Sequence, residues 1–72
     1  MIEIYTKPNC PACVEAKQLL DGDDYIEYDV THAKYKELLL ERFPAARTVP
    51  QIFMNGVHIG GRDELKELLK GN

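Results

Sequence analysis

Two cysteines, Cys10 and Cys13, stand three positions apart in this chain of 72 residues. Thiols at this spacing can exchange with a disulfide: one thiolate attacks, a mixed disulfide forms, and the second thiol displaces the substrate. Pro11 favours the first position of a helix, which places Cys10 at the N-cap, where free N–H groups and the helix dipole favour a thiolate. Lys7 adds a nearby cation, which also lowers a thiol pKa. We therefore predict Cys10 as the nucleophile and Cys13, one turn further, as the resolving thiol.

Three other roles for the cysteine pair are weighed at this point. Cysteines often serve as small buried apolar residues. Zinc sites usually take four ligands, and only His32 and His58 are available as histidines beside the pair. A structural bridge would close a loop of about four residues, for which the loop-entropy account gives roughly 2 kcal/mol. We therefore expect a redox pair and no bound metal.

Hydrophobic periodicity divides the chain into short strands and helices. Alternating and β-branched residues mark strands, and apolar residues at helical spacing, followed by Gly22 or Pro44, mark the first two helices. Asn55 and Gly56 between two apolar runs predict a type I′ hairpin. We predict strands at residues 2–6, 25–30, 51–54 and 57–60, and helices at residues 11–20, from a Thr31 cap to Pro44, and from Gly61 to Lys70.

The order of these elements defines the fold class. Strand, helix and strand imply a right-handed parallel crossover, whereas a hairpin is antiparallel, so the sheet must be mixed and covered by helices. The prediction is an α/β fold of βαβαββα order, with a four-stranded mixed sheet flanked by three helices. No repeat, linker or low-complexity segment interrupts the pattern, so residues 1–72 are expected to form a single domain.

The composition limits the class of partner. A net charge of -3 argues against nucleic acid, since a phosphate backbone requires a basic face. No run approaches the roughly 18 apolar residues of a membrane span, and the first residues lack the pattern of a signal peptide. We therefore expect a cytoplasmic protein without a membrane partner. In a reducing cytosol a close cysteine pair is more often catalytic or metal-binding than structural.

Two further segments have unusual backbone requirements. The bond between Val49 and Pro50 could be cis, but only about 5–6% of X-Pro bonds are, so the general frequency favours trans. Gly60 and Gly61 suit the close approach of a carboxylate to N–H groups at a helix start, although a double glycine is more often a simple turn. Both points stay open on the sequence pattern alone.

Taken together and in order, four motifs resemble those of glutaredoxins. They are Lys7, residues 10–13, residues 47–50 and residues 60–63. The element order is similar to the thioredoxin fold in its small form. The resemblance runs over essentially the whole chain, which is close in length to the compact dithiol glutaredoxins of bacteria and their viruses. It implies a glutathione-dependent disulfide oxidoreductase, with glutathione as co-substrate, and a cis bond before Pro50.

The resemblance also implies roles for individual residues. Lys7 and Arg47 would hold the glycine carboxylate of glutathione, and the backbone of Val49 would pair with its cysteinyl part. The backbone of Arg62 and the side chain of Asp63 would hold the γ-glutamyl end. The implied site consists of catalytic Cys10 and Cys13 and of glutathione-binding Lys7, Arg47, Thr48, Val49, Pro50, Gly61, Arg62 and Asp63.

Two positions depart from the common glutaredoxin pattern. Ala12 stands where Tyr is usual, which removes an aromatic wall, and Glu37 stands where many members carry Gln, which places a negative charge near a bound carboxylate. Both bear on glutathione affinity more than on the reaction. Independently of the family, Lys7, Arg47 and Arg62 each flank a motif in an acidic chain. They are expected to form one cationic pocket that attracts a small anion.

These inferences lead to one principal function and two alternatives. The principal prediction is a monomer whose Cys10 attacks glutathione mixed disulfides and protein disulfides. Ribonucleotide reductase is one candidate target, and glutathione returns the protein to its reduced state. The first alternative is a redoxin reduced by thioredoxin reductase that donates electrons to ribonucleotide reductase. The second is a dimer that binds an iron–sulfur cluster through Cys10 and glutathione.

Overall fold

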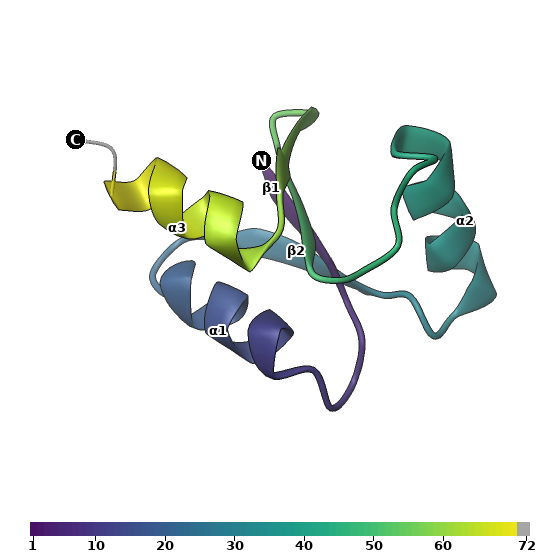
Figure 1. Ribbon diagram of the computed structural model, residues 1–72, viewed down its shortest axis with the longest axis horizontal. Coiled ribbons are helices and arrows are strands. Elements are labelled where there is room, and N and C mark those ends of the chain that lie inside the picture. The colour runs from purple at the N-terminus through teal and green to yellow at the C-terminus, as the bar shows by residue number, and fades with distance from the viewer. Residues whose placement is uncertain (71–72) are drawn as a thin grey trace.

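The computed structural model describes residues 1–70, and the last two residues of the predicted domain lie outside this range. Its elements follow in the order β1 (Ile2–Thr6), α1 (Pro11–Leu19), β2 (Tyr25–Asp29), α2 (Ala33–Arg42), β3 (Gln51–Met54), β4 (Val57–Gly60) and α3 (Arg62–Lys70) (Figure 1). The predicted order is confirmed. The first helix and the second strand each end one residue earlier than predicted.

The four strands form one mixed sheet in the order β2-β1-β3-β4. β1 lies parallel to β2, because α1 connects them as a crossover, and antiparallel to β3. β4 returns antiparallel to β3 through the hairpin. Asn55 and Gly56 have φ angles of 51° and 82°, the positive values that a type I′ turn needs at both positions. The predicted α/β class is confirmed.

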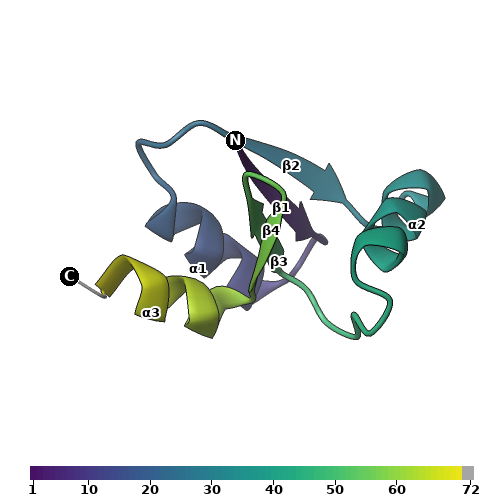
Figure 2. The same ribbon diagram turned by 90° about the horizontal axis from the view of Figure 1, so that it is seen from above.

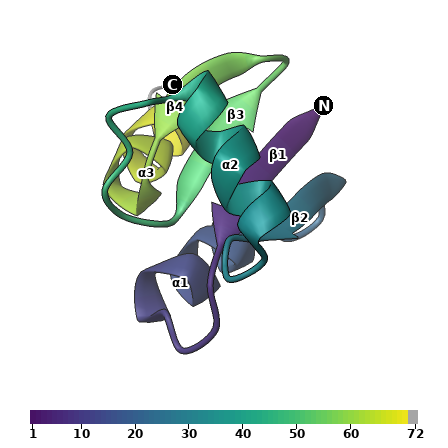
Figure 3. The same cartoon turned by 90° about the vertical axis from the view of Figure 1, so that its right-hand side faces the viewer.

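Helices cover both faces of this sheet (Figures 2 and 3): α1 and α3 lie on one face, and α2 lies on the other. Successive residues of a strand point to opposite faces of the sheet. Ile4 and Ile52 therefore pack in the core cluster on one face, and Tyr5 and Phe53 pack in the cluster on the other. The first core cluster is completed by Ala16, Leu20 and Leu65, and the second by Leu39 and Ala46. No helix among residues 1–70 is long and apolar enough to cross a membrane.

The turn between β2 and α2 corrects the expectation that Thr31 caps the second helix. The amide and the hydroxyl of Thr31 both donate to Oδ1 of Asp29, at 2.9 and 2.7 Å, and these bonds lower the pKa of Asp29. His32 is the N-cap of α2 instead, without a side-chain capping bond. The carboxylate at the end of β2 thus engages Thr31 before the helix begins.

A polar network ties the end of α2 to the sheet. The guanidinium of Arg42 donates to Glu3 at 3.0 Å and to the hydroxyl of Tyr5 at 3.1 Å, and it stacks 4.0 Å from the ring centre of Phe53. The hydroxyl of Tyr28 also donates to Glu3 at 3.0 Å. The hydrogen bond from Arg42 lowers the pKa of Glu3, whereas burial and the nearby carboxylate raise the pKa of Tyr28. This network holds the C-terminal end of α2 against the sheet.

Candidate active site

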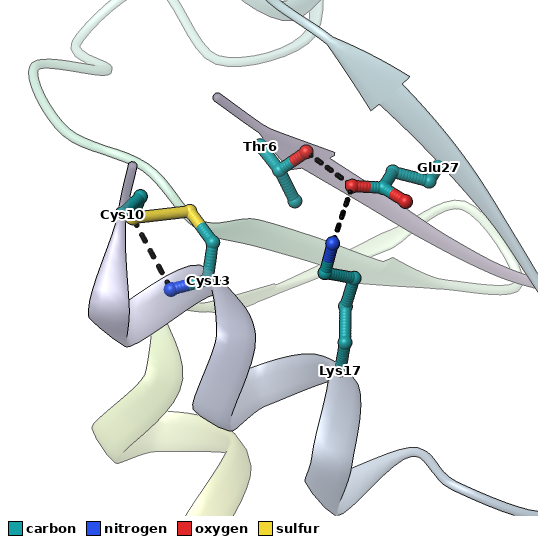
Figure 4. A network of polar contacts seen from close by, with 5 residues as sticks. All are labelled: Thr6, Cys10, Cys13, Lys17 and Glu27. Carbon is teal, nitrogen blue, oxygen red and sulfur yellow. Dashed lines mark hydrogen bonds and ion pairs between the residues drawn. A yellow bond between two sulfur atoms is a disulfide. The ribbon is translucent and has the colours of Figure 1, made fainter. Parts of the chain in front are cut away.

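Cys10 occupies the N-cap of α1, as the position of Pro11 predicts. The backbone N–H of Cys13 donates to Sγ of Cys10 at 3.2 Å, and the N–H groups of Cys13 and Val14 also bond to the Cys10 carbonyl. The two cysteines form a disulfide, with their Cα atoms 5.2 Å apart (Figure 4). Cys10 is 8% exposed and Cys13 only 1%. Cys10 is therefore the sulfur nearer to solvent and to the positive end of the helix dipole.

A network behind the cysteines joins α1 to the first two strands (Figure 4). Oε2 of Glu27 accepts a hydrogen bond from the hydroxyl of Thr6 at 2.7 Å and one from Nζ of Lys17 at 2.9 Å. The bond from Thr6 and then that from Lys17 lower the pKa of Glu27. Thr6 directly precedes Lys7, and Lys17 follows Cys13 by one helical turn. The network thus ties the strand before the nucleophile's loop to the helix after it.

The Val49–Pro50 segment faces the nucleophile. The peptide bond between Val49 and Pro50 is cis, as the resemblance implied and against the general frequency of X-Pro bonds. The carbonyl oxygen of Val49 lies 3.8 Å from Sγ of Cys10. Directly before Val49, the carbonyl of Thr48 accepts a hydrogen bond from the Gln51 side chain at 2.9 Å. The backbone of this segment is thereby positioned beside the sulfur that is expected to react.

A cavity of about 300 Å³ opens on one side of Thr48 and Val49; we call it the cationic cavity. Lys7 and Arg47, which the sequence predicts to act together, both line it. Lys36 lines it as well, and sequence reasoning missed this residue. The sequence held only a partial signal: Lys36 shares a helical face with Leu39 and Leu40, three and four positions on, and the structure shows that both of these also line the cavity.

A smaller cavity of about 200 Å³ opens on the other side of the same segment; we call it the mixed-charge cavity. It is lined by Ala12, Thr48, Val49, Pro50, Gly61, Arg62, Asp63 and Glu64. Gly61 permits a close approach here, since a Cβ at this position would lie 3.3 Å from the carbonyl oxygen of Pro50. The amide of Gly61 already donates to Oε1 of Glu64 at 2.7 Å, as in one half of a capping box.

The expectation of one pocket shared by Lys7, Arg47 and Arg62 is wrong. Arg62 lines the mixed-charge cavity, whereas the other two line the cationic cavity, because Thr48 and Val49 lie between the two spaces. Arg62 is also paired with acids, at 3.5 Å from Glu15 and at 3.1 Å from Asp63.

Two other candidates lie away from the cavities. Glu37 is exposed on α2 and lines neither cavity. His58 is exposed on β4, where its ring stacks on Phe43 and Phe53 with ring centres 4.2 and 5.0 Å apart. Among residues 1–70 no cluster of three or more His, Cys, Asp or Glu side chains could hold a metal ion.

A mixed four-stranded sheet with a Cys-Pro-Ala-Cys disulfide at the start of α1 and a cis-proline opposite defines a thioredoxin-like redox protein. The sequence matches the Glutaredoxin family over residues 2–59, and the chain belongs to this family, whose members are generally thiol–disulfide oxidoreductases.

Individual glutaredoxins bear out this assignment. The chain is 43% identical to Glutaredoxin 3 of Escherichia coli (strain K12), covering 93% of this chain and 83% of the relative. The solution structure of a dithiolic glutaredoxin of Trypanosoma brucei brucei matches with a TM-score of 0.83 and 33% identity, over 97% of this chain and 77% of that one. A buckwheat glutaredoxin–glutathione complex matches with a TM-score of 0.78 and 28% identity, over 97% and 69%.

Proposed function

We propose that this protein is a glutathione-dependent thiol–disulfide oxidoreductase that reduces glutathione mixed disulfides and protein disulfides through Cys10 and Cys13. One observation carries the proposal: Sγ of Cys10 lies 3.8 Å from the carbonyl of Val49, and Val49 separates a cationic cavity from a mixed-charge cavity. A substrate sulfur that reaches Cys10 has a backbone partner beside it and a charged space on either side.

The reaction starts from the reduced protein. The Cys10 thiolate attacks the glutathione sulfur of a mixed disulfide, the substrate thiolate leaves and takes a proton from solvent, and glutathione stays bound to Cys10 through a disulfide. A second glutathione thiolate then attacks the glutathione sulfur, which yields glutathione disulfide and frees Cys10. With a protein disulfide, Cys13 displaces the bound substrate and the Cys10–Cys13 disulfide forms. In each case two thiols are oxidised while one substrate disulfide is reduced.

The two cavities match the two ends of glutathione by charge. The γ-glutamyl end carries both an ammonium and a carboxylate, and it suits the mixed-charge cavity of Arg62, Asp63 and Glu64. The glycine end carries one carboxylate and suits Lys7 and Arg47 in the cationic cavity. The cysteinyl part then lies along Val49. The similar buckwheat protein was solved as a glutathione complex, which supports this choice of ligand.

The environments of the two sulfurs support their division of roles. Sγ of Cys10 accepts the N–H of Cys13 at the helix start, and both this hydrogen bond and the dipole favour a thiolate there. Cys13 is almost fully buried, which favours its neutral thiol and keeps it from attacking substrates in solution. Cys13 is close enough to Cys10 to displace a substrate that Cys10 holds.

Glutathione-coupled turnover tests the proposal. Cys10→Ser is expected to abolish turnover with both a glutathionylated peptide and a protein disulfide. Cys13→Ser is expected to retain turnover of the glutathionylated peptide and to lose reduction of the protein disulfide. Turnover that persists in Cys10→Ser, or reduction by thioredoxin reductase without any response to glutathione, would contradict the proposal.

A further inference from the structure

The cationic cavity holds more positive charge than the glycine end of glutathione requires. Lys7, Lys36 and Arg47 line it, and no acidic side chain of the described residues 1–70 lines it. Within residues 1–70 none of these three cations forms an ion pair. The whole chain carries a net charge of -3, so three unpaired cations around one cavity are a local exception. Glutathione brings a single carboxylate to them.

The size and walls of this cavity also exceed what a glycine needs. Its volume is about 300 Å³, and one water molecule occupies about 30 Å³ of liquid. A terminal glycine consists of one methylene between an amide and a carboxylate, so it fills a small part of this space. The remaining wall is largely apolar and includes Val30, Leu39, Leu40 and Ala46. A longer side chain that ends in a carboxylate would contact both the apolar wall and the cations.

The position of the cavity relative to Cys10 determines which substrate residue reaches it. Thr48 and Val49 line both cavities, and Val49 lies beside the sulfur of Cys10. A peptide whose cysteine reaches Cys10 therefore places the preceding residue at one cavity and the following residue at the other. In the orientation of the proposed function, on which this step rests, the following residue enters the cationic cavity.

We propose that the cationic cavity is a specificity subsite for the residue that follows the reacting cysteine of a protein substrate, and that it selects Asp or Glu there. Lys36 supplies the additional cation, from a helix on the opposite face of the sheet from the cysteines. The substrates favoured in this way are proteins whose reactive cysteine is followed by an acidic residue.

Two isomeric peptides test the subsite. The symmetrical disulfides of acetyl-Ala-Cys-Glu-amide and acetyl-Glu-Cys-Ala-amide have the same charge and composition and differ only in the place of the acid. Each is mixed with the reduced protein without glutathione: Cys10 and Cys13 become a disulfide, and their two protons end on two peptide thiols. Acid quenching and chromatography give the rate. The isomer with Glu after Cys is expected to react about three to five times faster at low salt, and about equally fast near 1 M salt.

Variants of α2 assign the selectivity to one side chain. Lys36→Gln is expected to reduce the rate ratio of the two isomers below about two, and Lys36→Glu to bring it to one or less. Lys34→Gln is the matched control, because it removes the same charge from the same helix. Lys34 lies over the ring of Tyr35, at 5.7 Å, and does not line the cavity. The rate ratio of the two isomers in Lys34→Gln is expected to equal that in the unmodified protein. Urea unfolding checks that each variant is folded.

The outcomes separate this inference from the proposed function. Equal rates for the two isomers in the unmodified protein would overturn the subsite, and so would a loss of selectivity in Lys34→Gln as large as that in Lys36→Gln. The peptide assay contains no glutathione, so it is independent of the glutathione-coupled assay. If the protein prefers the isomer with Glu after Cys but shows no glutathione-coupled turnover, only the glutathione dependence is overturned. Normal glutathione turnover without peptide selectivity would overturn only the subsite.

Discussion

Replacing Gln51 by Met is predicted to weaken the fold and, in the proposed function, the binding of a glutathionylated substrate. Gln51 is 7% exposed, and its Nε2 donates to the carbonyl of Thr48 at 2.9 Å while its Oε1 lies 2.8 Å from Nε2 of His58. Met keeps the length of the side chain but forms neither bond. At about 0.5–1.5 kcal/mol net for each bond, the free energy of unfolding should fall by about 1–3 kcal/mol.

The same substitution should affect substrate binding more than turnover. Thr48 belongs to the backbone between the two cavities. A Thr48 carbonyl that is no longer held in place should therefore raise KM for a glutathionylated peptide about two- to fivefold and change kcat by less than about twofold. His58→Phe is the graded control. It keeps the stacking on Phe43 and Phe53 and the bond between Gln51 and Thr48, and it removes one bond only.

Urea unfolding and steady-state kinetics measure both effects. The unfolding free energy is expected to decrease in the order unmodified protein, His58→Phe, Gln51→Met, with KM increasing clearly only in Gln51→Met. An unfolding free energy of Gln51→Met within about 0.5 kcal/mol of the unmodified protein, together with an unchanged KM, would refute the reasoning. A larger effect in His58→Phe than in Gln51→Met would also refute it, since the hydrogen bonds would then not be the cause.

Three further predictions concern the core, the pH dependence and the rim of the mixed-charge cavity. Leu65 on α3 is fully buried in the first core cluster. Leu65→Ala should therefore lower the free energy of unfolding, measured by urea titration, by about 2–5 kcal/mol. A loss below about 1 kcal/mol would contradict the place of Leu65 in the core. The pKa of Glu3 is lowered from 4.5 by Arg42, so its contribution to stability is present above that value and is lost as the pH falls through the folded pKa. Urea midpoints between pH 6 and pH 3 should therefore fall less steeply in Glu3→Gln than in the unmodified protein, and equal slopes would argue against the pair. Ala12 lines the mixed-charge cavity, and a tyrosine there would add an aromatic wall. Ala12→Tyr should therefore lower KM for a glutathionylated peptide by about two- to tenfold. An unchanged KM would mean that this position does not contact the substrate.

Much of the fold follows from local sequence signals. The hairpin at Asn55 and Gly56 requires positive φ at both positions, which few other residue pairs tolerate, and the structure has this geometry. Pro11 fixes the start of α1 and thereby the N-cap position of Cys10. The element order then determines a mixed sheet, because a parallel crossover and a hairpin must share it. The hairpin and the N-cap depend on neighbouring residues only, and the mixed sheet depends on the order of the elements.

The arrangement of charges around the site depends on contacts between distant segments, and here the sequence was less informative. Arg62 was expected beside Lys7 and Arg47, but the Val49 segment lies between them, and no local pattern reports such a separation. Lys36 was missed because one lysine on an exposed helix face looks like a solvated residue until the opposite wall of the cavity is known.

The bond from the Gly61 amide to Glu64 was missed in a similar way. A glutamate three residues after an N-cap position is a known capping pattern, but glycine at the cap hides half of it. This bond occupies the Gly61 amide, so the three amides that follow it at the start of α3, those of Arg62, Asp63 and Glu64, are the donors for the γ-glutamyl end in the proposed orientation.

Trapping of the first covalent intermediate tests the central claim most directly. In Cys13→Ser the resolving thiol is absent, so the Cys10 thiolate should attack glutathione disulfide, release one glutathione and retain the other as a mixed disulfide. Mass spectrometry of the intact protein and its peptides is expected to find one glutathione, attached to Cys10, with the formation rate rising with pH around a midpoint below the ordinary thiol pKa of about 8.5. Absence of this adduct, or a midpoint at or above that value, would contradict the account.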